Sequence, residues 1–195
     1  MFRRISNLNF ILTLLKKVER VEIGGKAVFL EHMKTIYTLI ILLTTSLMAT
    51  AQKEVKPAYQ RFPTVPPLSL NAPNGKLLSK GDLKKNAPVL IMYFSPECDH
   101  CQQQTREMTA RMKDLEHVQI VMASYQPLES LEAFSKTYNL GKFSNILLGR
   151  DSQFLLPPFY NIGSLPFLAL YDKKGNFISI HEGNVSVDKL IAALK

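Results

Sequence analysis

Two cysteines, Cys98 and Cys101, are the residues of this 195-residue chain whose type and spacing point most directly to chemistry, and the chain has no others. An apolar, β-prone run over residues 89–94 leads into the pair, and a pattern with helical spacing follows it. A CxxC pair between a strand and a helix is typical of a dithiol–disulfide redox centre. The sequence therefore predicts that these sulfur atoms exchange disulfides with other molecules.

The predicted position at the start of a helix assigns different roles to the two cysteines. Cys98 would lie where unpaired backbone N–H groups and the helix dipole stabilise an anion, which favours its nucleophilic thiolate. Cys101, one turn later, would be more buried and would resolve the mixed disulfide. A protonated His100 would favour the thiolate of Cys98, whereas Glu97 and Asp99 would oppose it. We expect these three neighbours to tune the redox balance.

Metal binding is another use that a cysteine pair can have. A structural zinc ion needs about two further ligands, but the remaining histidines, His32, His117 and His181, lack zinc-finger spacing. Copper held by both cysteines and a histidine or methionine is a weaker alternative. A purely structural disulfide is disfavoured, because so short a loop removes little entropy from the unfolded chain. The sequence predicts no metal and no other cofactor.

The N-terminal residues have the pattern of an export leader. Met33 and Lys34 precede an apolar run over residues 36–48, and an Ala-Thr-Ala cleavage pattern follows at 49–51, so residues 33–51 are predicted to be a signal peptide. Residues 1–32 then represent a start codon assigned too far upstream, or a basic leader. We expect an exported, periplasmic protein that meets the membrane only transiently, or one tethered to it if the leader is not cleaved.

The chain after this leader has the size and charge of one small domain. Residues 52–195 contain 17 Lys and Arg against 13 Asp and Glu, a net charge of +4 compared with +8 for the whole chain. No basic cluster is interleaved with aromatic residues, so we expect no nucleic-acid partner. Residues 52–62 are predicted to be a linker and residues 63–195 a single domain. In an oxidising compartment, its two cysteines would act on the thiols and disulfides of partner proteins.

The hydrophobic pattern of the domain predicts alternating strands and helices. After a hairpin that turns at residues 74–75, the expected elements are strand 89–94, helix 99–115, strand 118–123, helix 128–138, short strand 146–148, an interrupted helix over 152–160 ending near Pro157 and Pro158, strands 167–171 and 177–181, and helix 187–194. The continuously apolar strands suit a sheet covered on both faces.

This order of elements, together with two separated motifs, resembles the thioredoxin fold, and more narrowly the exported thiol–disulfide oxidoreductases of the TlpA/ResA type. The motifs are Ser-Pro-Glu-Cys-Asp-His-Cys after a strand and Gly-Ser-Leu-Pro-Phe-Leu at residues 163–168. The resemblance implies a three-layer α/β fold with a central mixed sheet, an N-terminal β-hairpin and an insertion, residues 128–160, between its halves. It also implies that Pro166 is cis and faces the cysteines, with Leu165 offering its backbone to an extended peptide.

The chain departs from that family at two positions next to its cysteines. Glu97 stands where the family usually has a tryptophan. Met92 stands where many thioredoxins carry a buried aspartate that accepts the proton of the resolving thiol. The missing carboxylate favours a partner-specific role over general thioredoxin-like turnover.

The resulting hypothesis is an exported enzyme that reduces disulfides of partner proteins with electrons from an unidentified donor. Three alternatives stay open. The pattern Cys-x-His-Cys also occurs in oxidants of the DsbA type, so the protein could be a thiol oxidant or isomerase. It could bind copper as a metallochaperone, or it could be a binding module without turnover. Peroxide reduction is disfavoured, because no threonine stands two or three residues before Cys98.

Overall fold

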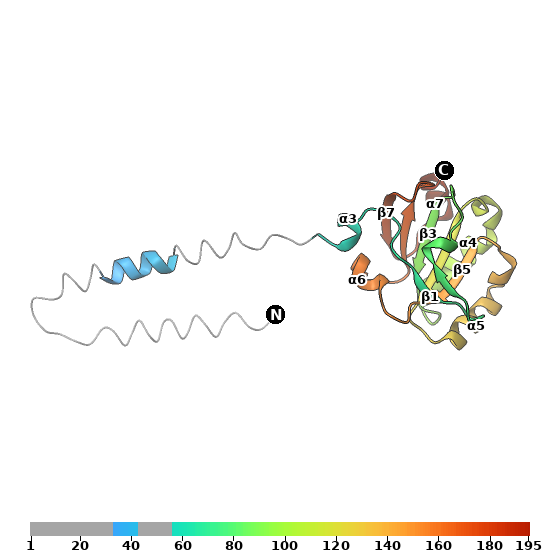
Figure 1. The fold of residues 1–195 in the computed structure, drawn as a ribbon, viewed down its shortest axis with the longest axis horizontal. Helices are drawn as coiled ribbons and strands as arrows, with labels where there is room; N and C mark the ends of the chain where they lie inside the picture. Colours follow the sequence, from blue (N-terminus) through green and yellow to red (C-terminus); the bar gives the residue numbers. More distant parts are fainter. Residues whose placement is uncertain (1–32, 43–55) are drawn as a thin grey trace, which may run out of the picture. The chain divides into compact units, whose positions relative to one another are not determined.

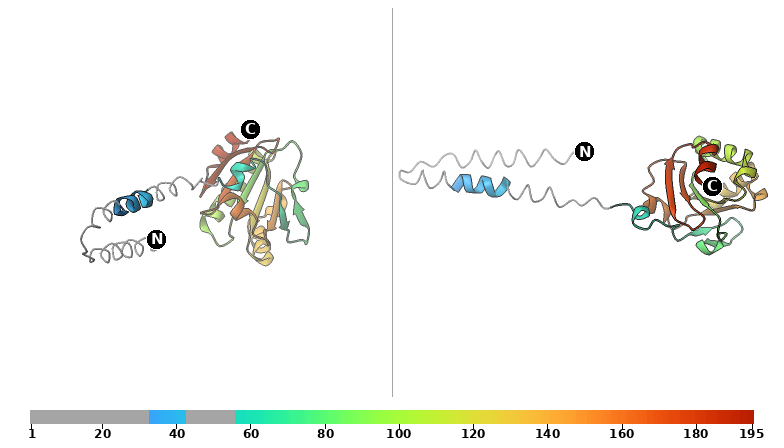
Figure 2. Two further views of the ribbon diagram at one scale, coloured as in Figure 1. Left: turned by 60° about the vertical axis from the view of Figure 1, so that its left-hand side comes forward. Right: turned by 90° about the horizontal axis from the view of Figure 1, so that it is seen from above.

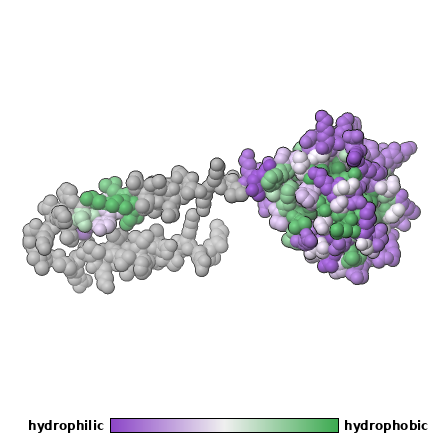
Figure 3. Space-filling model, in the orientation of Figure 1, coloured by the Kyte–Doolittle hydropathy of each residue, from purple (hydrophilic) through white to green (hydrophobic). Residues whose placement is uncertain are grey.

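The computed structural model of the chain describes residues 33–42 and 56–195, which belong to two separate units. Residues 33–42 form a helix with exposed apolar side chains (Figures 1 and 3). This helix lies within the predicted signal peptide, whereas residues 1–32 and the cleavage pattern at 49–51 lie outside the described residues. Among the described helices, none is both long enough and apolar enough to span a membrane.

A seven-stranded mixed sheet organises residues 56–195, with the strand order β2-β1-β5-β4-β3-β6-β7 (Figure 1). Strands β3, β4 and β5 are parallel, and every other neighbouring pair is antiparallel. The strands are β1 (Ser69–Asn71), β2 (Leu77–Ser79), β3 (Val89–Tyr93), β4 (Gln119–Ser124), β5 (Ile146–Arg150), β6 (Phe167–Tyr171) and β7 (Phe177–Glu182). The predicted hairpin is formed by β1 and β2, and Gly75 turns it with a φ of +82°.

Helices cover both faces of this sheet, as the views in Figure 2 show. They are α3 (Ala58–Arg61), α4 (Asp99–Ala110), α5 (Leu128–Thr137), α6 (Leu156–Tyr160) and α7 (Val187–Ala193), with 3₁₀ turns η1 (Lys80–Asp82), η2 (Met112–Leu115) and η3 (Leu140–Lys142). The side chains of α4, α5 and α7 pack into one core. Those of α6 and α3 pack into a second core on the opposite face. The predicted three-layer α/β fold is confirmed.

Strand β3 separates the two cores and carries the chain to the cysteines. Leu90 and Met92 belong to the core beneath α4, whereas Val89, Ile91 and Tyr93 belong to the core beneath α6. All five residues of the strand are buried. This two-sided burial explains the continuous apolar run, because successive side chains of a strand point to opposite faces. The face of this unit seen in Figure 3 carries hydrophilic and hydrophobic residues side by side.

The segment before β6 differs from its sequence prediction. Helix α6 begins at Leu156, so Pro157 and Pro158 lie in its first turn and do not end it. A proline is tolerated there because the first N–H groups of a helix need no intrahelical acceptor. Asp151 supplies the start signal, since its carboxylate accepts hydrogen bonds from the N–H groups of Leu155 (3.0 Å) and Leu156 (2.9 Å).

Two other boundaries also differ. The predicted helix 99–115 is divided into α4 and η2, because Arg111 between them has a non-helical φ of −116°. The compact unit begins at Lys56 and so includes residues 56–62, which the sequence assigned to a linker. Tyr59 of α3 ties this segment to the domain, since its ring centroid lies 6.2 Å from that of Tyr160 and 5.4 Å from that of Phe177.

Candidate functional site

Cys98 is the residue from which helix α4 begins. Its backbone is extended (φ −84°, ψ 116°), and its sulfur accepts a hydrogen bond from the backbone N–H of Cys101 (3.4 Å). The turn that precedes it is closed by a bond from the Cys98 N–H to the carbonyl of Ser95 (3.1 Å). The sulfur therefore lies at the N-terminus of a three-turn helix, where the backbone N–H groups favour an anion.

The two free thiols lie in contrasting environments. Cys98 is partly exposed, whereas Cys101 is 0% exposed and belongs to the core beneath α4. Burial raises the pKa of the Cys101 thiol to about 12, and its interaction with the Cys98 sulfur acts in the same direction. Cys101 thus keeps its proton at neutral pH, and Cys98 is the more accessible of the two thiols. Met92 is fully buried in the same core, so its position supplies no carboxylate.

The structure places Leu165 and Pro166 beside Cys98, although 67 positions separate Leu165 from it in the sequence. The Cys98 sulfur lies 3.9 Å from the Leu165 carbonyl oxygen, and the Leu165–Pro166 peptide bond is cis. Strand β6 starts directly after this bond and pairs with β3, which leads into Cys98. Because β3 and β6 are adjacent and antiparallel, the end of β3 and the start of β6 lie side by side, and so do the motifs attached to them.

The other predicted site residues lie at the surface around the helix start. The side chains of Glu97, Asp99 and His100 are all exposed, so solvent screens their charges. His100 contributes its backbone, because its carbonyl accepts a hydrogen bond from the side-chain amide of Asn184 (3.1 Å).

Sequence reasoning did not single out Gln104, which is 0% exposed one turn after Cys101. Its side-chain oxygen accepts a hydrogen bond from the N–H of Val185 (2.7 Å), and its side-chain nitrogen donates to the Val185 carbonyl (3.0 Å). A polar residue three positions after Cys101, on the same helix face, was a signal that could have identified it.

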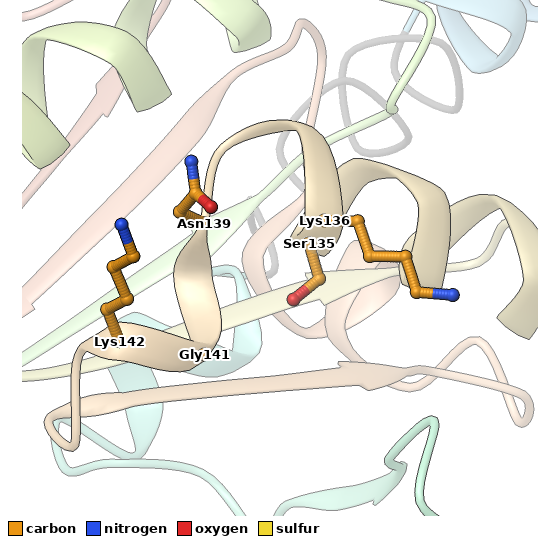
Figure 4. A pocket seen from close by; sticks show the side chains of 5 residues that line it. All are labelled: Ser135, Lys136, Asn139, Gly141 and Lys142. Carbon is orange, nitrogen blue, oxygen red and sulfur yellow. The ribbon is translucent and has the colours of Figure 1, made fainter.

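No group of three His, Cys, Asp or Glu side chains that could hold a metal ion occurs within residues 33–42 and 56–195. Two surface hollows in the domain are lined without either cysteine. One, of about 410 Å³, lies at the end of α5 between Ser135, Lys136, Asn139, Gly141 and Lys142. In Figure 4, the side chains of its two lysines extend away from each other and do not converge on one point. The other, of about 510 Å³, lies between Phe62, residues 64–67, Lys80 and Phe159.

A mixed sheet covered by helices on both faces, with a CxxC pair at the start of α4 and a cis X-Pro bond opposite, defines the thioredoxin-like class of α/β proteins. Residues 63–182 match the model of the AhpC/TSA family. Since this match covers more than half of the chain, the protein belongs to the AhpC/TSA family. No curated protein sequence is significantly similar to the chain.

Solved structures from several bacteria share the fold. A secreted disulfide oxidoreductase of Mycobacterium tuberculosis, homologous to E. coli DsbE, matches with a TM-score of 0.55 and 17% identity over 65% of this chain and 92% of that one. StoA from Bacillus subtilis matches with a TM-score of 0.52 and 19% identity over 67% of this chain and 98% of that one. A thiol:disulfide interchange protein from Chlorobium tepidum matches with a TM-score of 0.56 and 16% identity over 72% of this chain and 96% of that one. At these identities, the likeness is one of fold.

Proposed function

We propose that this protein is an exported thiol–disulfide oxidoreductase that reduces disulfides in partner proteins. The observation that carries the proposal is the arrangement of a partly exposed Cys98 at the start of α4, a buried Cys101 one turn behind it and the Leu165 carbonyl 3.9 Å from the Cys98 sulfur. The family and the fold support redox chemistry at this site. Export rests on the leader pattern at residues 33–51.

The proposed reaction has two exchange steps. The Cys98 thiolate attacks one sulfur of a partner disulfide, forms a mixed disulfide and displaces the second partner sulfur as a thiolate, which takes up a proton from water. Cys101 then loses its proton and attacks the Cys98 sulfur, which releases the first partner sulfur as a thiol and leaves a Cys98–Cys101 disulfide. Two electrons pass to the partner, and a donor dithiol must return them.

The second step is the more demanding one. Burial raises the pKa of Cys101 to about 12, and the apolar Met92 in the same core supplies no carboxylate to accept its proton. Because only the thiolate attacks a disulfide, resolution is expected to be slow. A long-lived mixed disulfide suits an enzyme that holds one selected partner rather than turning over many.

Leu165 and Pro166 are proposed to form the docking edge for the partner chain. An extended peptide that pairs with the backbone of Leu165 would lie alongside the Cys98 sulfur, as in the addition of a strand to a sheet edge. Glu97, Asp99 and His100, which are exposed and adjoin the cysteines in the sequence, are proposed to tune the redox balance of the pair.

Trapping the mixed disulfide tests this proposal. The Cys101→Ser variant, expressed with its leader, should accumulate covalent adducts that a reductant releases, and the partners can be identified by mass spectrometry. The matched Cys98→Ser variant retains only the buried cysteine and should form none. If the Cys101→Ser variant forms no adduct that depends on Cys98, the proposed reaction is wrong.

The direction of electron flow separates this function from a thiol oxidant. A reductase is expected to have a Cys98–Cys101 reduction potential close to that of thioredoxin, about −270 mV, and an oxidant one nearer −120 mV. Equilibration of the purified domain with glutathione buffers measures this potential. A value at the oxidising end would reverse the proposed direction while retaining both cysteines as the reacting groups.

A further inference from the structure

Residues 182–185, which comprise the last residue of β7 and the first part of its connection to α7, contact both sides of the candidate thiol site. The Glu182 carboxylate at the end of β7 accepts hydrogen bonds from the backbone N–H of Gly163 (2.9 Å) and from the hydroxyl of Ser164 (3.0 Å). Both residues directly precede Leu165, whose carbonyl faces the Cys98 sulfur. Glu182 therefore holds the chain that leads into the docking edge.

The two residues that follow reach the docking edge and the cysteine helix in turn. The N–H of Gly183 donates a hydrogen bond to the Pro166 carbonyl (2.8 Å). The side-chain amide of Asn184 donates to the carbonyl of His100 in the first turn of α4 (3.1 Å). Three consecutive residues thus join the two parts of the site, which come from opposite halves of the domain.

The end of this segment is fixed to the interior of α4. Val185 is buried, and its N–H and carbonyl both bond to the side chain of Gln104. Because breaking them would leave buried polar groups unpaired, these two hydrogen bonds resist rearrangement. The segment consequently starts from a fixed position relative to the helix that carries both cysteines.

Glu182 and Asn184 differ from this buried anchor because their side chains are exposed. Removing either one leaves no polar group stranded in a core, since water can solvate the released donors and acceptors. Such bonds therefore contribute little to overall stability. Their direct effect is on the position of the two chain segments that they join.

We propose that Glu182 and Asn184 are positioning residues that set the Leu165 carbonyl relative to the Cys98 sulfur and so align an extended partner peptide for attack. The inference rests on the proposed reduction of partner disulfides. It distinguishes two kinds of substrate. A disulfide within a polypeptide needs the aligned docking edge, whereas a small aromatic disulfide reaches Cys98 without it.

The test compares two disulfides with the Glu182→Ala variant. With insulin and dithiothreitol as donor, kcat/KM should fall about tenfold, which corresponds to about 1.4 kcal/mol, and the loss should lie mainly in KM. The rate with the small disulfide 5,5′-dithiobis(2-nitrobenzoate) should change less than about twofold. Glu182→Gln should restore most of the insulin activity, because its amide can accept from Gly163 and donate to Ser164.

A control variant and two substitute variants accompany Glu182→Ala. Glu116→Ala removes an exposed glutamate beyond the far end of α4 and should alter neither rate. If Glu182→Ala fails to fold, Ser164→Ala and Asn184→Ala should still lower the insulin rate selectively. An equal loss with both disulfides, or no loss with insulin, overturns the positioning role. A wild-type protein that reduces the small disulfide but not insulin overturns the inference alone, whereas one that reduces neither refutes the proposed function as well.

Discussion

Cys98 and Cys101 are two residues apart, but the start of a helix gives them different chemistry. One sulfur lies at the helix N-terminus and is partly exposed, and the other lies in a core and keeps its proton. This asymmetry supports the proposal that Cys98 attacks the partner disulfide and Cys101 resolves the mixed disulfide. It follows from their places at the helix start, because Cys98 is the N-cap that precedes α4, whereas Cys101 lies on the helix face that packs into the core.

Alkylation of the reduced domain should show this difference. At about pH 8, iodoacetamide is expected to modify Cys98 and leave Cys101 unmodified over the same period, because Cys101 is buried and burial holds its pKa near 12. Peptide mass spectrometry measures both rates. In denaturant, which removes the burial, both should react at similar rates, and equal rates in the folded protein would contradict the assignment.

Met92 provides a second prediction at the residue scale. Met92→Asp should shorten the lifetime of the mixed disulfide, because a carboxylate in this core could accept the proton of Cys101. The same change should lower stability by about 1–3 kcal/mol or more, since an unpaired carboxyl replaces a fully buried apolar side chain. Met92→Leu controls for packing, and decay of a trapped adduct gives the lifetime. A lifetime unchanged by Met92→Asp would mean that a carboxylate there does not assist resolution.

Among the elements, strand β5 joins the N-terminal hairpin to the parallel part of the sheet. It pairs with β4 on one side and with β1 on the other. Gly149 permits the second contact, because a Cβ at this position would lie 2.7 Å from the Leu70 Cβ and 3.3 Å from the Asn71 carbonyl. The hairpin and β5 can approach closely only because a glycine stands there.

Gly149→Ala is therefore expected to destabilise the domain by about 1–3 kcal/mol, the usual cost of overpacking. Urea unfolding followed by circular dichroism measures the change. Gly141→Ala is the matched control, since a Cβ there would meet nothing within 4 Å and no positive φ constrains the position. A Gly149→Ala variant as stable as Gly141→Ala would show that β1 and β5 can separate at no cost.

At the scale of the whole molecule, both cores bury groups that can lose a proton at high pH. Cys101 lies in one core, and Tyr160 and Tyr171, whose hydroxyls are 2.5 Å apart, lie in the other. Burial raises the pKa of Cys101 and of Tyr171 to about 12 and that of Tyr160 well above its usual value. Both cores therefore favour the protonated forms.

These raised pKa values make the fold less stable as the pH rises. A folded pKa above the unfolded one stabilises the fold fully below the unfolded pKa, about 8.5–10 for these groups, and this stability is lost as the pH rises toward 12. The urea midpoint of the reduced domain should fall steadily above about pH 9. Replacing Tyr160 and Tyr171 together with Phe should make the decline shallower. A midpoint independent of pH in this range would contradict the prediction.

Features set by residues close together in the sequence were predictable, whereas contacts between distant residues were not. The hairpin at residues 74–75, strand β6 and the start of α4 were predictable, because turn residues and hydrophobic period act over a few positions. The start of α6 was misplaced, because it depends on capping by Asp151, which the hydrophobic pattern does not reveal. The bonds of Glu182 and Gln104 were not predictable, since their partners lie 18 to 81 positions away.

The sequence by itself indicated the class of fold and the two sulfur atoms that we propose to react, because a CxxC pair after a buried strand and before a helix is a local pattern. Only the tertiary structure decided what surrounds those atoms. Pairing of β6 with β3 sets the Leu165 carbonyl beside Cys98, and the segment after β7 ties this edge to α4. The physical reason is that backbone and side-chain hydrogen bonds join whichever residues the strand order makes neighbours, and that order is a property of the whole sheet.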